Sequence, residues 1–220
     1  MLHVVLTNCV IEWKETAISS SMLNLIARIS SRIFLGEELC RNDAWLRITQ
    51  NWTVEGFKAV MHNPAYPDAI KFLLPWIKKD YWTVKQLYNE ACTVIAPVIE
   101  KRNQIKAEAK RKGEPVPVYN DALEWGEIEC QGITYVPQDL QLVLSFAAIH
   151  TTSNLAGLTL ARLAEDPQLI PLLREEMISV LRADGLSKTG IYNLRLLDSA
   201  LKETQRVAPD ARCKFPFQPH

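Results

Sequence analysis

Hydrophobic residues recur at helical spacing along most of the chain. Over 16–36 and 80–112 the apolar positions follow steps of three and four residues, which places them on one face of a helix. The same spacing predicts helices over 43–60, 167–184 and 194–208. The alternation typical of strands is almost absent, and its best short candidate is 132–136. The pattern therefore predicts an all-α protein.

Helix boundaries are marked by residues that favour capping positions. Gly36 and Gly185 predict helix ends, since glycine readily adopts the positive φ common there. Asp43 predicts a helix start, because its carboxylate can accept a hydrogen bond from a free backbone N–H. Asp166–Pro167 predicts another start, as N-cap and first helical residue.

Proline residues predict two interruptions. Pro97 lies inside the long helical pattern, where it removes a backbone donor and should kink the helix. Three prolines within 62–76 predict a loop with one short helix.

The segment 138–165 is the most informative part of the chain. It is apolar nearly all round, which predicts a long helix buried in the middle of the protein. Five successive polar residues, 150–154, interrupt it, and burying them costs free energy unless they are hydrogen-bonded. In one interpretation, their hydroxyls bond to carbonyls one turn earlier and bend the helix. In the other, the helix opens over a ligand, where a hydroxyl and a histidine manage protons.

Composition narrows the functional classes. The 25 basic and 25 acidic residues balance, which argues against a nucleic-acid-binding surface. No apolar run is long enough to span a membrane. The five cysteines form no Cys-x-x-Cys pair, so a zinc finger is excluded, and their odd number disfavours a disulfide framework.

A second motif is Glu203-x-x-Arg206, whose side chains share one helix face and can pair. The same spacing occurs at 38–41 and 108–111. The motif therefore carries weight only through its position, two helices after the polar group of 138–165.

Three stretches in this order resemble the cytochrome P450 superfamily of haem-thiolate monooxygenases. Within it, they are most similar to a fungal branch that oxidises terpenoids and other secondary metabolites. The three stretches are 146–154, 172–176 and 196–206, and 27–36, 39–46 and 119–125 are similar as well. The resemblance implies a partial domain over 1–209, the central part of that fold, and an unstructured tail over 210–220.

The resemblance also implies a site. The helix 138–165 would cross the distal face of haem b, with Phe146, Ala147 and Ala148 lining the distal pocket. The small alanine pair would let a flat ligand approach the backbone closely.

Four further side chains receive roles by resemblance. In the family, an acid–alcohol pair on this helix helps deliver protons to dioxygen. Thr151 stands at the alcohol place, and His150 stands at the acid place, as is typical of the fungal branch. Glu203 and Arg206 match a structural ion pair behind the haem.

The implied function is insertion of one oxygen atom of dioxygen into a small apolar substrate. Electrons would come from an NADPH-dependent reductase, and full-length relatives lie at the endoplasmic reticulum membrane. The family's axial-ligand loop, Phe-x-x-Gly-x-x-x-Cys-x-Gly, is not found in these residues, and Cys213 lacks the flanking glycines. We therefore expect this chain to be a fragment cut at both ends, without its N-terminal anchor or metal ligand and catalytically inactive.

Other interpretations stay open at this point. The chain could be a non-catalytic helical binding or interaction module, or a pseudogene fragment that binds no haem. A third interpretation is an unrelated helical protein with chance motifs.

Overall fold

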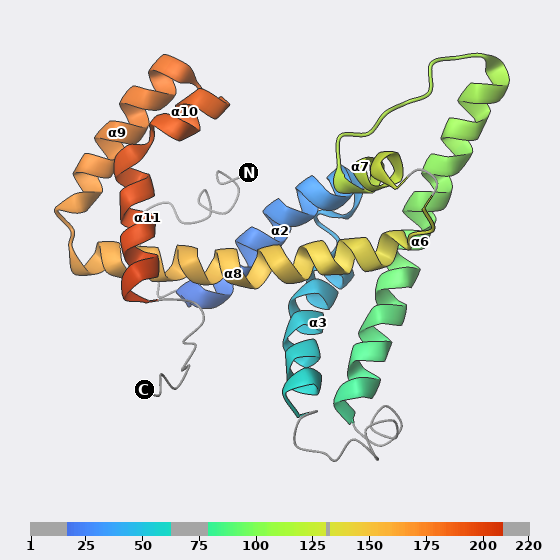
Figure 1. Cartoon of the computed structure of the whole chain (residues 1–220), viewed down its shortest axis with the longest axis horizontal. Coiled ribbons are helices and arrows are strands. Elements are labelled where there is room, and N and C mark those ends of the chain that lie inside the picture. The colour runs from blue at the N-terminus through green and yellow to red at the C-terminus, as the bar shows by residue number, and fades with distance from the viewer. Residues whose placement is uncertain (1–16, 63–78, 131–132, 209–220) are drawn as a thin grey trace, which may run out of the picture.

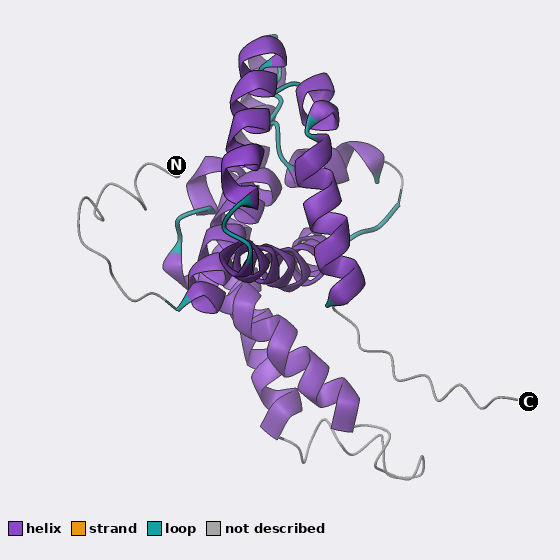
Figure 2. Cartoon of the chain, turned by 90° about the vertical axis from the view of Figure 1, so that its left-hand side faces the viewer, coloured by secondary structure: helices purple, strands orange, loops and turns teal. Residues whose placement is uncertain are grey.

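The computed structural model describes residues 17–62, 79–130 and 133–208, and its regular structure there is entirely helical (Figures 1 and 2). The all-α prediction is confirmed. The strand candidate at 132–136 is wrong for its described part, since Ile133–Val136 forms no strand. The helices are α2 (Ile18–Leu39), α3 (Asp43–His62), α6 (Lys79–Lys112), α7 (Ala122–Glu129), α8 (Pro137–Glu165), α9 (Leu169–Asp184), α10 (Lys188–Asn193) and α11 (Arg195–Val207).

Helix α8 is the axis of the molecule and contacts α2, α3, α6, α7 and α11 (Figure 1). Its most extensive partner is α2, which runs antiparallel to it. Ala27 of α2 clusters with Ile149 of α8, and Ile18 near the start of α2 faces Gly157. Half of the buried residues of the two helices are small and not glycine: Ala27, Ser30 and Ser31 on α2, and Ser145, Ser153 and Thr159 on α8.

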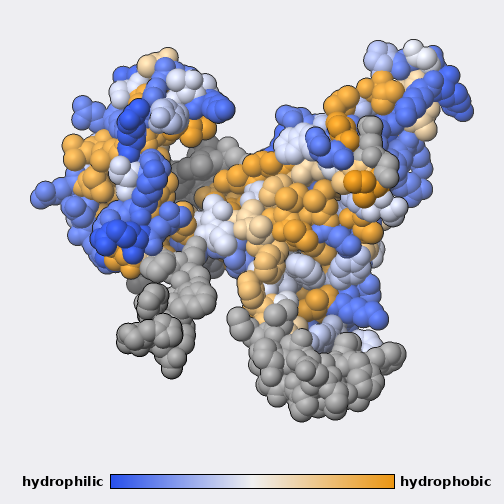
Figure 3. All heavy atoms as spheres, in the orientation of Figure 1, coloured by the Kyte–Doolittle hydropathy of each residue, from blue (hydrophilic) through white to orange (hydrophobic). Residues whose placement is uncertain are grey.

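Burial of α8 differs from the sequence prediction. Buried residues 142, 145, 149 and 153 follow steps of three and four, and Gln141 and Thr159 are buried as well. Apolar side chains elsewhere, such as Val143 (57% exposed) and Leu160 (43% exposed), remain at the surface of the described structure. Figure 3 shows hydrophobic residues gathered at the surface over the middle of the molecule, where α8 crosses its neighbours. The pattern of hydrophobic residues correctly predicted a helix here. It did not predict which sides of that helix are covered by other described residues.

Helices α3 and α6 form the second large pairing and contribute most of the main core. Trp45 is fully buried there, and its indole Nε1 donates to the Ser31 hydroxyl at 3.1 Å. Helix α6 continues through Pro97 without a break. Other core residues are Leu35, Ile48, Leu87, Ala91, Ile95, Leu123 and Leu142.

Two predicted caps were placed wrongly. The cap of α3 is Asn42, whose Oδ1 accepts from Trp45 N at 2.9 Å, while Asp43 is the first helical residue. Asp166 does not cap the start of α9 but stands at the C-terminal cap of α8. A turn follows it, and α9 begins at Leu169. The helix end at Gly185 is confirmed, with φ +64°.

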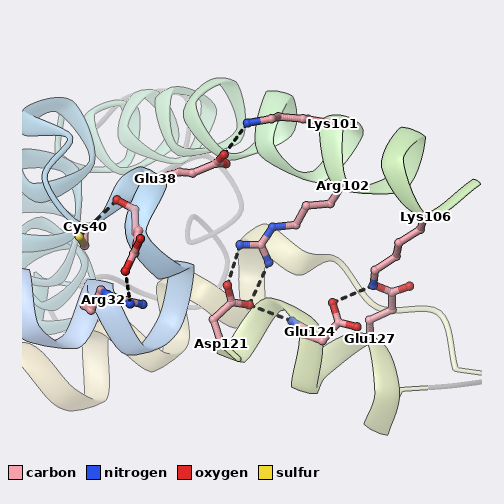
Figure 4. Close-up of polar contacts among 10 residues, drawn as sticks. Arg32, Glu38, Cys40, Lys101, Arg102, Lys106, Asp121, Glu124 and Glu127 are labelled. Carbon is pink, nitrogen blue, oxygen red and sulfur yellow. Dashed lines mark hydrogen bonds and ion pairs between the residues drawn. The ribbon is translucent and has the colours of Figure 1, made fainter. Parts of the chain in front are cut away.

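A row of ion pairs joins α6 to α7 and α2 (Figure 4). Its centre is Arg102, whose Nη1 and Nη2 donate to the carboxylate oxygens of Asp121 at 2.9 and 2.6 Å. Both side chains are buried, and the Tyr119 ring lies 4.2 Å from the Arg102 guanidinium. Burial disfavours the charge, but the hydrogen bonds and charge of Asp121 outweigh it, so the pKa of Arg102 is raised. Asp121 also caps α7 by accepting from Glu124 N at 3.2 Å.

Gly36 allows α2 to approach this pair. Its backbone leaves helical geometry, with φ +76° and ψ −159°, a region that only glycine adopts readily. A Cβ there would lie 2.8 Å from Asp121 Oδ2 and 3.4 Å from Arg102 Nη2. The helix end predicted at Gly36 is only partly right: the backbone does leave helical geometry there, but helical structure resumes and α2 extends to Leu39.

We expect Gly36→Ala to destabilise the chain by roughly 2–4 kcal/mol, since the methyl group adds backbone strain and displaces a buried carboxylate. Gly113→Ala is the control, because Gly113 also has a positive φ (+71°) but its Cβ would meet nothing within 4 Å. That change should cost only about 1–2 kcal/mol. Urea unfolding followed by circular dichroism measures both, and equal losses would contradict the close approach to Asp121.

Candidate functional site

The polar group of α8 borders a hollow of about 590 Å³ between α8 and the N-terminal half of α2. Its lining includes His150 and Thr151 from the middle of α8, and Ile18 and Leu23 from α2. The two candidate proton-handling side chains therefore share one hollow, and apolar residues form much of its remaining wall.

Thr151 is exposed, and its Oγ1 donates to the Ala147 carbonyl at 2.6 Å. Ser153 bonds back in the same way, to His150 O at 3.1 Å. These two hydroxyls thus donate to backbone carbonyls about one turn earlier in α8, as the first interpretation of this segment predicts. Because a hydroxyl oxygen has two lone pairs beside its single proton, the Thr151 oxygen can accept a further hydrogen bond while it donates to Ala147.

His150 is half-buried and reaches α3, where its Nε2 lies 3.0 Å from the Gln50 carbonyl oxygen. This contact spans 100 residues of sequence and ties the middle of α8 to the middle of α3. The sequence gives no sign of this partner, because it is a main-chain atom of a distant helix.

Phe146 lies in an aromatic group one turn before His150. Its ring stacks on Phe57 with centroids 5.0 Å apart, and Trp52 meets it edge-on at 6.2 Å. Ala147 is exposed and Ala148 half-buried. The three residues predicted to line a pocket thus differ, since Phe146 packs towards α3 while Ala147 shares the exposed row of Thr151.

The predicted ion pair of α11 is present. Arg206 Nε and Nη2 donate to the two carboxylate oxygens of Glu203, both at 2.7 Å. These hydrogen bonds lower the pKa of Glu203 below its usual value. Both side chains are largely exposed, at 60% and 72%, so solvent screens the pair in the described structure.

Sequence reasoning missed the group that holds the start of α11. No side chain at the N-terminus of α11 caps it, but the Glu176 carboxylate of α9 accepts from Leu196 N at 2.7 Å and from Leu197 N at 3.0 Å. A negative charge at this end also interacts favourably with the helix dipole. Glu176 thereby fixes the helix that carries Glu203 and Arg206, and only the tertiary structure brings the two helices together.

Comparison with known proteins identifies the family. The family model described as Cytochrome P450 matches residues 12–215. The chain belongs to the cytochrome P450 family. The resemblance seen in the sequence is confirmed, and the interpretation as an unrelated helical protein is wrong.

Fungal monooxygenases are among the relatives of this cytochrome P450 chain. It is 44% identical over 202 residues to cytochrome P450 monooxygenase hepE of Aspergillus oryzae, covering 91% of this chain and 37% of that protein. It is 42% identical to a cytochrome P450 monooxygenase of Gibberella fujikuroi, covering 91% of this chain and 46% of that protein. The chain therefore spans less than half the length of these relatives. No solved structure matches it.

The cytochrome P450 family implies a haem, and the described residues fit one face of it. Ala147 and Thr151 are exposed and adjacent on α8, so a flat group can approach their small side chains. The described ranges contain no group of three or more His, Cys, Asp or Glu residues able to hold a metal ion. None of the described helices is long and apolar enough to cross a membrane.

Glu176→Gln should destabilise the chain by about 1–2 kcal/mol, because the neutral amide keeps one acceptor but loses the second and the charge at the start of α11. Glu175→Gln is the matched control, since the Glu175 side chain is exposed and makes no hydrogen bond within the described structure. Thermal unfolding followed by circular dichroism compares the two. An equal effect of both changes would show that Glu176 does not cap α11.

Proposed function

We propose that this chain forms the distal wall of a haem monooxygenase that oxidises a small apolar substrate, a terpenoid or other secondary metabolite. The observation that carries the proposal is the exposed Ala147–Thr151 row of α8, beside a hollow that His150 also lines. The fungal monooxygenases similar to the chain support the reaction class. Haem, when bound, supplies the binding and activation of dioxygen.

Thr151 is proposed to handle a proton at its Oγ1. In the structure this hydroxyl donates to Ala147 O, so its oxygen is an acceptor towards the hollow. Rotation about the Cβ–Oγ1 bond turns the same proton towards a ligand, at the cost of the bond to Ala147. The short backbone bond therefore holds the proton in a defined place until a better acceptor arrives.

His150 is proposed to exchange protons beside Thr151. Its Nε2 faces the Gln50 carbonyl, so proton uptake and release fall to Nδ1. The aromatic group of Phe146, Phe57 and Trp52 packs one turn before His150 and places apolar surface on the side of α3.

The remaining roles follow the family. Glu203 and Arg206 are proposed to stabilise the part of the fold behind the haem, and an NADPH-dependent reductase is proposed as the electron donor. The complete enzyme would act at the endoplasmic reticulum membrane. We propose that the 220 residues alone form no haem-thiolate complex and are inactive, because they carry no residue in the family's cysteine-loop pattern.

The test is a full-length chimera in which residues 18–207 replace the matching segment of a fungal relative. Thr151→Ala should lower product formation about 10²-fold, since it removes one preorganised donor, while hydrogen peroxide released per NADPH consumed rises. Thr152→Ala is the matched control, because the side chain of the neighbouring Thr152 is exposed and makes no hydrogen bond in the described structure. This variant should leave both quantities unchanged.

Substrate binding, measured by the spectral shift of the haem, should be unchanged in both variants. Unchanged coupling in Thr151→Ala would leave Thr151 as a residue that only satisfies itself within α8.

A further inference from the structure

The bond between His150 and Gln50 defines the hydrogen positions of the imidazole. A carbonyl oxygen can only accept, so at 3.0 Å the Nε2 of His150 must carry the hydrogen. In the neutral ring, Nδ1 is then an acceptor without a proton. The ring makes no other hydrogen bond with the described residues.

The acceptor itself is held from a second side. The Gln50 side chain donates through its Nε2 to Asn24 Oδ1 of α2 at 3.0 Å. Gln50 thereby links α2 through its side chain and α8 through its main chain. The carbonyl that meets His150 belongs to the interior of α3 and moves only with that helix.

We infer that the Gln50 main-chain carbonyl is the positioning group for His150, fixing the Nε2–H tautomer and presenting Nδ1 as the nitrogen that exchanges protons. The inference rests on the proposed function of His150 and deepens it. A proton taken up at Nδ1 gives an imidazolium whose Nε2–H still donates to Gln50, and its release restores the neutral ring. Proton exchange therefore requires no break between α3 and α8, whereas displacement of α3 removes the constraint on the ring.

The direct test is nuclear magnetic resonance of the full 220-residue chain labelled with ¹⁵N in histidine and ¹³C at the Gln50 carbonyl. The chain has four histidines, and the signals missing from His150→Gln assign His150. We expect the Nε2–H tautomer, with a scalar coupling across the hydrogen bond from Nε2 to the Gln50 carbonyl carbon. The Nδ1–H tautomer, or the absence of this coupling, would overturn the inference.

Two variants of α3 test how the carbonyl is held. Gln50→Ala keeps the carbonyl but removes the link to Asn24, so the His150 Nε2–H should exchange with water at least several-fold faster. Asn51→Ala is the matched control, since the side chain of the neighbouring Asn51 is exposed and makes no hydrogen bond in the described structure. This variant should leave the exchange rate unchanged. Equal rates in the two variants would contradict the role of the Asn24 link.

Two replacements of His150 test the tether itself. In His150→Gln the amide can still donate to the Gln50 carbonyl, so the melting temperature should stay closer to that of the native chain than in His150→Ala. An equal loss in both would count against the tether. These measurements need neither haem nor turnover, so failure of the proposed monooxygenase activity would leave them standing, and a wrong tautomer would leave the Thr151 test unaffected.

Discussion

The close approach of α2 to α8 is the constraint on which the rest of the structure depends. Beside larger buried residues such as Leu35 and Ile149, both helices bury small side chains, among them Ala27 and Ser31 on α2 and Ser145 and Ser153 on α8. Such residues let two backbones pack closely, and their hydroxyls can bond to the helix itself without leaving a buried donor unpaired. With α2 fixed on one side, α8 turns its Ala147–Thr151 row outward and its His150 towards α3.

Polar contacts then hold the remaining helices to this pair. The buried Arg102–Asp121 bridge joins α6 and α7 next to Gly36 of α2, and Glu176 fixes α11 from α9. The first pairs both Nη atoms of a buried guanidinium, whose Nε has no hydrogen-bond partner among the described residues. The second satisfies free N–H groups at a helix start. Helix packing also forms the candidate site. Its side chains come from α2 and α8, and α3 contributes the main-chain carbonyl of Gln50.

The long helices and the family could be predicted from the sequence, because hydrophobic periodicity and the order of motifs can be read from a single chain without knowledge of its tertiary contacts. It missed α7 and α10, which have 8 and 6 residues and are too short to show a helical period. It assigned the cap of α3 to Asp43 because aspartate and asparagine both cap well, and only geometry selects Asn42. The partners of His150 and α11 could not be predicted, since Gln50 and Glu176 are brought there by the tertiary fold.

Amide hydrogen exchange of the purified chain tests the central role of the α2–α8 pairing most directly. Residues 27–39 of α2 and 141–159 of α8 should be the slowest to exchange, and should lose protection together as urea is added. Residues 169–207 of α9 to α11 should exchange earlier, since α9 has a single buried residue, Leu173. Rapid exchange in the middle of α8 while α9 to α11 stay protected would contradict the account.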